Sequence, residues 1–336
     1  MTRRRLHFLV PYVLLAPGLL WLAVFYVYPS FQMFLTSFWT GTLETGFELT
    51  WNTDSYAKAI NQFGPQFLRS ITYAGAATVI TFLISFPLAY TIAFKGGRYK
   101  SVLLFLVIAP FFTSFLLRTL SWGLILGDEG ILLGPLKRVG LVGDDFRLLA
   151  TPVAVVSGIA YNFLAFMTLP IYVSLEKIDK RLVEAAEDLY AGPWRPGGAR
   201  WGAVIGGATG AFMSFAFSAE PLVLVVLAVL GAVAGALIGW FLISQAFLRV
   251  ALPLALPGVF AGTLLTFIPA AGDYVNAELL GNPSTRMIGN VIQSRFLTLN
   301  DYPTAAALSF LLMAGILIAV AVYARLLGTE ELTSAA

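Results

Sequence analysis

The sequence predicts an all-α protein that crosses a membrane several times, and three observations support this. Hydrophobic residues make up 58% of the chain and charged residues only 12%, whereas a soluble domain carries about 25% charged residues. Eight long stretches contain no charged residue, namely 8–43, 70–94, 101–117, 148–175, 201–219, 221–248, 250–272 and 302–324. A helix needs roughly 17–25 apolar residues to cross a bilayer. The apolar residues are continuous rather than alternating, which favours helices over barrel strands.

The charges between these stretches predict how the chain is threaded. Three arginines at positions 3–5 place the N-terminus in the cytoplasm, because cytoplasmic flanks are rich in Lys and Arg. We read the apolar start as an uncleaved first span. Spans are then expected at 10–38, 66–94, 101–126, 150–175, 201–218, 221–243, 250–280 and 303–324. This threading puts 13 of the 21 basic residues inside and 8 at the outer face, with both termini cytoplasmic.

Composition also argues against several kinds of site. The basic residues are dispersed, so the net charge of +3 is better explained by flanks of membrane spans than by nucleic acid. The chain has no cysteine, and its one histidine, His7, stands beside three arginines. We therefore expect no metal site, no catalytic residues and no cofactor. No phosphate-binding glycine loop is present, so ATP hydrolysis is not expected in this chain.

A charged segment at 175–190 is expected to form a cytoplasmic helix. Apolar residues recur there at spacings of three and four, which marks one helix face: Leu175, Ile178, Leu182, Ala185 and Leu189. Glu176, Lys180 and Glu184 form a ladder at four-residue spacing on another face. The pattern alone fits a helix lying on the membrane surface or one docking into a partner's groove.

Within this segment, Glu184-Ala185-Ala186 followed by Asp188-Leu189 and Gly192 resembles the EAA loop of bacterial ABC importer permeases. The resemblance implies a coupling helix that sits in a cleft of a separate ATP-binding subunit. The residues assigned to this coupling are Glu184, Ala185, Ala186, Asp188, Leu189 and Gly192. It also implies a second permease subunit and an extracytoplasmic substrate-binding protein, with no enzymatic activity in this chain.

The resemblance also shows an insertion. The expected ending of the loop, Ala246 to Pro253, follows only after the segment 196–244. We therefore expect a six-span permease core in two parts, 1–195 and 245–336, with a two-helix transmembrane hairpin at 196–244 and Glu220 at its outer tip. Glycines at four-residue spacing in the hairpin fit close helix packing, although glycine is also simply common in membrane helices.

The segment around Asp273 interrupts an apolar run. Pro269 and Gly272 weaken the helix, and Asp273 follows directly. A carboxylate at membrane depth usually faces a cavity or a partner. From Val250 to Asp273 is 23 residues, about 35 Å of helix, so the span could equally have ended, with Asp273 among the lipid headgroups.

Several blocks resemble spermidine/putrescine-type permeases: Gly272-Asp273-Tyr274, Leu279 to Gly281, Met287 to Asn290 and Pro110 to Trp122. The resemblance implies import of polyamines or similar small organic cations across a bacterial or archaeal cell membrane. Carboxylates and aromatic faces suit a flexible ammonium chain. The expected substrate path contains Asp273, Tyr274, Glu278, Trp122 and Tyr161. Importers of an opine, sulfate or iron remain alternatives, as does a membrane scaffold without transport activity.

Overall fold

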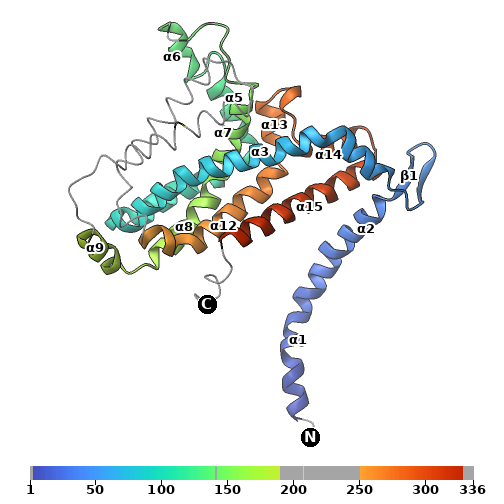
Figure 1. The fold of residues 1–336 in the computed structure, drawn as a ribbon, viewed down its shortest axis with the longest axis horizontal. Coiled ribbons are helices and arrows are strands. Elements are labelled where there is room, and N and C mark those ends of the chain that lie inside the picture. The colour runs from blue at the N-terminus through green and yellow to red at the C-terminus, as the bar shows by residue number, and fades with distance from the viewer. Residues whose placement is uncertain (1–2, 141, 190–206, 208–249, 328–336) are drawn as a thin grey trace. The chain divides into compact units, whose positions relative to one another are not determined.

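The computed structural model describes residues 3–140, 142–189, 207 and 250–327, and these are predominantly helical (Figure 1). Apart from Gly207, the expected hairpin at 196–244 lies outside the described residues. Four described helices are long and apolar enough to cross a membrane, and six spans result if each of two bent helix pairs counts as one. That number agrees with the six spans predicted for the core.

The first span is one nearly continuous helix. It consists of α1 (Arg3–Leu22), a π-helical turn η1 (Ala23–Val27) and α2 (Tyr28–Thr36). Its large side chains are exposed, Leu20 and Trp21 each to 66%. Exposed apolar residues around a whole helix are expected where lipid is the solvent.

Between the spans expected at 10–38 and 66–94, the structure adds two features. Strands β1 (Trp39–Thr42) and β2 (Gly46–Leu49) pair antiparallel as a short hairpin, with Trp39 opposite Leu49. Helix α3 (Asp54–Tyr90) then begins twelve residues before the expected 66. The side chain of Asn52 accepts from the backbone N–H of Asp54 at 2.8 Å, which supports a helix start in polar sequence. The length of the apolar stretch alone therefore does not predict the first turns of α3.

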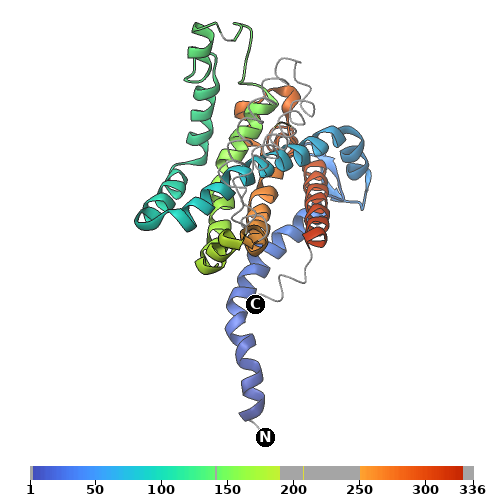
Figure 2. The ribbon, with the colours of Figure 1, turned by 60° about the vertical axis from the view of Figure 1, so that its left-hand side comes forward.

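Two of the predicted spans are bent helix pairs. After η2 (Thr91–Lys95) and η3 (Gly97–Tyr99), helix α4 (Lys100–Ile108) and η4 (Ala109–Phe112) meet α5 (Phe115–Leu126) at 95°. Figure 2 shows this sharp turn in the teal part of the chain. After α6 (Leu133–Arg138), helix α7 (Pro152–Asn162) meets α8 (Leu164–Glu176) at 44°.

The helix expected over 175–190 is divided. It belongs partly to α8 and partly to α9 (Lys180–Leu189), and the side chain of Asp179 accepts from the N–H of Arg181 at 3.0 Å where α9 begins. Leu182 of the predicted apolar face is 54% exposed, whereas Val183 is buried. The expected ladder is divided at the same place, because Glu176 is the last residue of α8 and forms a salt bridge with Lys100 at the start of α4, whereas Lys180 begins α9.

The remaining helices are α12 (Leu252–Ala271), α13 (Val275–Leu280), η6 (Pro283–Thr285), α14 (Ile288–Gln293), η7 (Ser294–Thr298) and α15 (Tyr302–Leu327). The span expected over 250–280 therefore ends at Ala271, and Gly272 caps it. Pro269 does not interrupt the helix, since it lies inside the last turns of α12.

The chain forms two compact units, each with its own core. The first comprises Met1–Phe67 and Ile288–Ala319, the second Leu68–Met287 and Val320–Ala336. Buried in the first are Ala59, Ile288, Leu308 and Leu312. The second has a larger core between α3, α8 and α12, whose buried residues are Phe86, Ala89, Tyr90, Ala93, Met167, Ile171, Leu175, Ala251, Ala255 and Val259.

Helices α8 and α12 pack so closely that glycine is required between them. A Cβ added at Gly258 would lie 2.4 Å from the carbonyl oxygen of Pro170 and 2.6 Å from Cβ of Ser174. At Gly262 it would lie 2.9 Å from Sδ of Met167. Small residues at such contacts let membrane helices approach closely.

We predict that Gly258→Ala destabilises the folded protein by about 1–3 kcal/mol, because the methyl group overpacks this contact. The control is Gly75→Ala in α3, where an added Cβ meets nothing within 4 Å. Thermal unfolding of both variants in detergent measures the difference. A Gly258→Ala melting temperature equal to that of Gly75→Ala would show that the two helices separate easily.

Candidate functional site

The break between α7 and α8 is lined by hydroxyl groups from α3. Phe163 lies between the two helices with φ −106° and ψ 6°. The hydroxyl of Thr81 donates to the carbonyl oxygen of Ala160 at 3.2 Å, and that of Ser85 donates to the carbonyl oxygen of Leu164 at 3.2 Å. Because the bilayer core offers no water, backbone carbonyls at a helix break need such donors from the protein. A polar seam therefore follows the break.

A second set of polar side chains extends this seam to α5 and α13. The amide nitrogen of Asn162 donates to Oγ1 of Thr119 and to Oδ1 of Asn276, each at 3.1 Å. All three residues are almost fully buried. Because the three side chains come from α7, α5 and α13, this network fixes these helices to one another.

Asp273 joins the same network. Its Oδ1 accepts from the backbone N–H of Asn276 at 2.9 Å, and its Oδ2 accepts from the Asn276 side chain at 2.7 Å. The residue lies beyond the end of α12 and is only 7% exposed. Burial raises the pKa of Asp273 above its ordinary value, and hydrogen bonds from Asn276 and Val275 oppose that rise. The carboxyl group thus caps the first turn of α13.

The other expected path residues divide into two groups. The rings of Trp122 in α5 and Tyr161 in α7 meet edge to face, with centroids 5.5 Å apart. Both stand within one turn of the network, since Trp122 follows Thr119 by three residues and Tyr161 precedes Asn162. Tyr274 and Glu278 have exposed side chains on and beside α13. Asp273, Trp122 and Tyr161 therefore lie on or next to α5, α7 and α13, the three helices that the polar network joins.

The sequence analysis missed the neutral members of the site. Thr119, Asn162 and Asn276 carry no charge, so a search for ionisable residues passed over them. The available signal was the rarity of asparagine inside an apolar run. Within the described residues, Oδ1 of Asn162 and Oγ1 of Thr266 are buried and find no hydrogen-bond partner.

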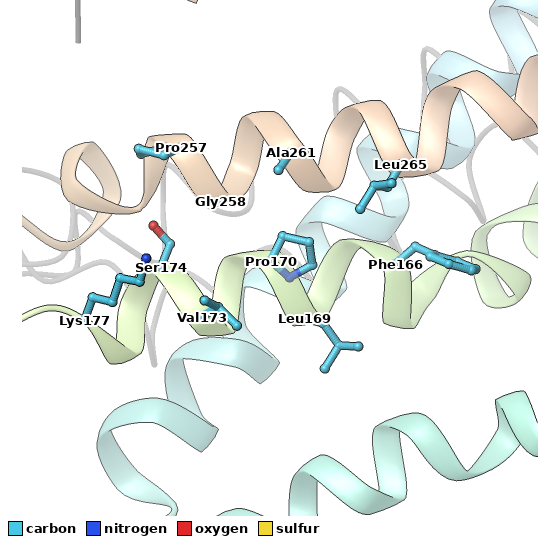
Figure 3. Close-up of a pocket in the computed structure, with 10 residues that line it drawn as sticks. All are labelled: Phe166, Leu169, Pro170, Val173, Ser174, Lys177, Pro257, Gly258, Ala261 and Leu265. Atoms are coloured by element: carbon cyan, nitrogen blue, oxygen red, sulfur yellow. The ribbon is translucent and has the colours of Figure 1, made fainter. Parts of the chain in front are cut away.

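A groove of about 460 Å³ runs between α8 and α12 (Figure 3). Most of its lining is apolar, with Phe166 and Leu265 toward one end. Ser174 and Lys177 lie at the other end, near Pro257. Polar groups in this groove are confined to one end, unlike those of the seam.

The expected coupling residues lie largely on α9. Glu184, Ala185 and Asp188 have exposed side chains there. Ala186 and Leu189 belong to the same helix, and Gly192 lies outside the described residues. A short, charged helix with exposed carboxylates is available to a partner.

Apolar helices that break around a buried polar seam are typical of membrane transport proteins. The comparisons with known proteins specify this class. The family described as binding-protein-dependent transport system inner membrane component matches residues 243–327. In fold, the chain is similar to a bacterial ABC transporter involved in the import of the acidic polysaccharide alginate, with a TM-score of 0.60 and 16% identity over 95% of this chain and 94% of that chain.

Curated relatives extend the match over most of the sequence. The chain is 31% identical over 306 residues to the spermidine/putrescine transport system permease protein PotB of Haemophilus influenzae, covering 91% of this chain and 90% of the relative. It is 27% identical over 332 residues to the inner membrane ABC transporter permease protein YdcU of Escherichia coli, covering 92% and 86%. The chain belongs to the family of binding-protein-dependent inner membrane transport components, the permeases of ABC importers.

We predict that Asn276→Ala lowers the melting temperature of the purified protein by several degrees. The substitution removes a hydrogen bond from Oδ2 of Asp273 and the acceptor of Asn162, and each buried group left unpaired costs about 1–3 kcal/mol. Ser121→Ala is the control, because Ser121 is exposed and donates only within α5. Equal melting temperatures for the two variants would contradict a stabilising role of the network.

Proposed function

We propose that this chain is the permease subunit of an ATP-driven importer of polyamines such as spermidine and putrescine, or of similar small organic cations. The observation that carries the proposal is the 31% identity to a spermidine/putrescine permease over nine tenths of both chains. The chemistry of the site agrees with it, since the Asp273 carboxyl group and the Trp122–Tyr161 rings offer the groups that bind alkylammonium ions.

We place the substrate path along α5, α7 and α13. Asp273, Trp122 and Tyr161 are its proposed inner residues, and Tyr274 and Glu278 stand on the exposed part of the same segment. A permease of this kind receives substrate from an extracytoplasmic binding protein. The path then needs only modest selectivity, which a few aromatic faces and carboxylates provide.

The energy for transport would come from a separate ATPase subunit that binds α9. The exposed carboxylates of Glu184 and Asp188 support this, together with the resemblance of the segment to an EAA loop. A second permease subunit completes the membrane domain. We place both termini in the cytoplasm of a bacterial or archaeal cell, with α9 on the same side.

A different substrate, such as an opine, sulfate or iron, is the principal alternative. A path that contains Asp273 and Glu278 would repel an anion such as sulfate, so the composition of the segment favours a cation over an anion, whether a polyamine or iron. A scaffold without transport activity would leave both α9 and the buried polar seam without a role. Uptake measurements distinguish these alternatives directly.

We predict that Glu184→Lys lowers substrate uptake and uptake-coupled ATP hydrolysis together, at least about tenfold, because reversing one interfacial charge typically costs more than 1.4 kcal/mol. The matched control is Glu48→Lys, the same exchange on the exposed strand β2. Both variants are measured in proteoliposomes that contain the complete transporter. Normal uptake by Glu184→Lys, at normal expression, would remove α9 as the coupling helix.

We predict that the complete transporter takes up labelled putrescine and spermidine, and that Asp273→Asn reduces this uptake more than Asn276→Ala does. Asp273→Asn keeps one acceptor oxygen but removes the negative charge, whereas Asn276→Ala removes the side-chain donor to Oδ2 of Asp273 and keeps the charge. Comparing the two therefore separates the charge from the structural bond.

The outcomes of this comparison differ in meaning. Equal losses of uptake in the two variants would make Asp273 a structural cap and remove it from the path. Absence of polyamine uptake by the unaltered transporter, with transport of sulfate or an opine instead, would overturn the proposed substrate.

A further inference from the structure

The groove between α8 and α12 has the polarity of an amphiphile (Figure 3). Phe166, Val173 and Leu265 line its apolar part, and all three side chains are exposed. Lys177 stands at one end beside Ser174, whose hydroxyl is the only other polar side-chain group among the described residues of the lining. A ligand of matching chemistry is long and apolar, with one polar group at its end.

Small residues on α12 create this groove. A Cβ added at Gly258 would clash with the backbone of Pro170 and with Ser174, so α12 lies directly on α8 there. Ala261, nearly one turn further along, carries only a methyl group, so the space beside the contact stays unfilled. Lipid tails are as apolar as leucine side chains, and an acyl chain of the bilayer fits such a space.

The length of the groove matches one leaflet of a bilayer. From Phe166 to Lys177 the chain advances eleven residues, about 17 Å along a helix, and the hydrocarbon part of one leaflet is about 15 Å thick. Lys177 directly follows the last residue of α8 and precedes α9, which the proposed function places in the cytoplasm. The basic end of the groove therefore lies at the depth of the lipid headgroups in the cytoplasmic leaflet.

The ammonium group of Lys177 is available to an anion. It forms no salt bridge with any described side chain. Its neighbour Glu176 pairs with Lys100, and the carboxylate of Asp179 accepts from the N–H of Arg181, so both acidic residues nearest in sequence have other partners. Basic pockets between membrane helices on the cytoplasmic side bind acidic lipid headgroups, and the end of this groove is such a pocket.

We propose that one anionic phospholipid of the cytoplasmic leaflet binds in this groove, with an acyl chain between α8 and α12 and its phosphate group at Lys177. The inference rests on the proposed function only for the side of the membrane on which α9 lies. It adds a ligand site that polyamine transport by itself does not require.

A lipid in this position joins two helices with different neighbours. Helix α8 leads into α9, the proposed coupling helix, whereas α12 leads to Asp273. A ligand that binds only the folded protein stabilises it in proportion to its concentration and affinity. Anionic lipid should therefore raise the melting temperature of the protein, and the size of the rise reports how well the groove binds it.

Titration with phosphatidylglycerol tests the phosphate contact. The purified full-length protein is titrated in detergent, and the rise in melting temperature gives an apparent affinity. Lys177→Gln should weaken this affinity about fivefold, the effect of removing one basic residue from an anionic lipid surface, whereas Lys177→Arg should retain it. The matched control is Lys95→Gln, the same exchange at an exposed lysine that ends η2 and does not line the groove.

A second variant tests the acyl chain. Ala261→Phe places a ring in the groove and leaves Lys177 in place, and it should also weaken the affinity for phosphatidylglycerol at least about fivefold. Ala314→Phe is the control, the same exchange at an exposed alanine of α15. Soluble glycerol phosphate, which carries the phosphate group without acyl chains, should not raise the melting temperature of the unaltered protein.

The other outcomes overturn the inference. Equal affinities of the Lys177→Gln and Lys95→Gln variants would reduce the effect to general attraction between lysines and an anionic surface. Equal stabilisation by glycerol phosphate would leave a phosphate site without a lipid. A Val173→Cys variant of this cysteine-free chain that cross-links to another subunit of the complete transporter would show that a protein covers the groove. Absence of polyamine uptake would overturn the proposed function alone, because the titration requires no transport.

Discussion

The hydrogen bonds of the α7–α8 break are the constraint on which the second unit depends. A helix that stops inside a bilayer exposes carbonyl groups to a medium that offers no donors. Here Thr81 and Ser85 of α3 supply those donors to the carbonyl oxygens of Ala160 and Leu164. These bonds link the positions of α3, α7 and α8 at the break, in addition to the bond that Thr168 of α8 donates to the carbonyl oxygen of Leu164.

The same break determines where the polar side chains gather. Asn162 is the last residue of α7, and its side chain meets Thr119 of α5 and Asn276 of α13. Asp273 in turn fixes the start of α13. On the other side of α8, Gly258 and Gly262 allow α12 to approach closely. Helix α8 thus packs against α12 through close contacts at small residues. The polar network instead holds α5, α7 and α13 together by hydrogen bonds.

The sequence was sufficient for the parts of the fold that depend on apolar length. The number of spans outside 196–244 and the helical class follow from charge-free stretches, because a continuous rather than alternating apolar run favours a helix over a barrel strand in lipid. The boundaries that failed depend on local bonds instead. Helix α3 begins early at a polar cap, and the stripe from Leu175 to Leu182 is divided where Asp179 starts a new helix.

The candidate site was predictable in its charged and aromatic members but not in its neutral ones. Asp273 can be recognised in the sequence as a carboxylate in an apolar run. Asn162 cannot be recognised in this way, because its position follows from the 44° bend between α7 and α8, which no residue pattern in the sequence predicts. The ring pair of Trp122 and Tyr161 joins positions 39 residues apart, so only the folded chain reveals it. Tertiary contacts, rather than residue types, decide which polar groups meet.

The cap that Asp273 provides has a kinetic consequence for any cation that reaches it. Each oxygen of the Asp273 carboxyl group already accepts a hydrogen bond from Asn276, so an ammonium group that reaches it shares the carboxyl group with Asn276. A shared acceptor holds a cation less strongly than a free one and gives a shallow energy well. A conduction pathway benefits from shallow wells, because an ion that is held weakly at every station leaves each of them quickly.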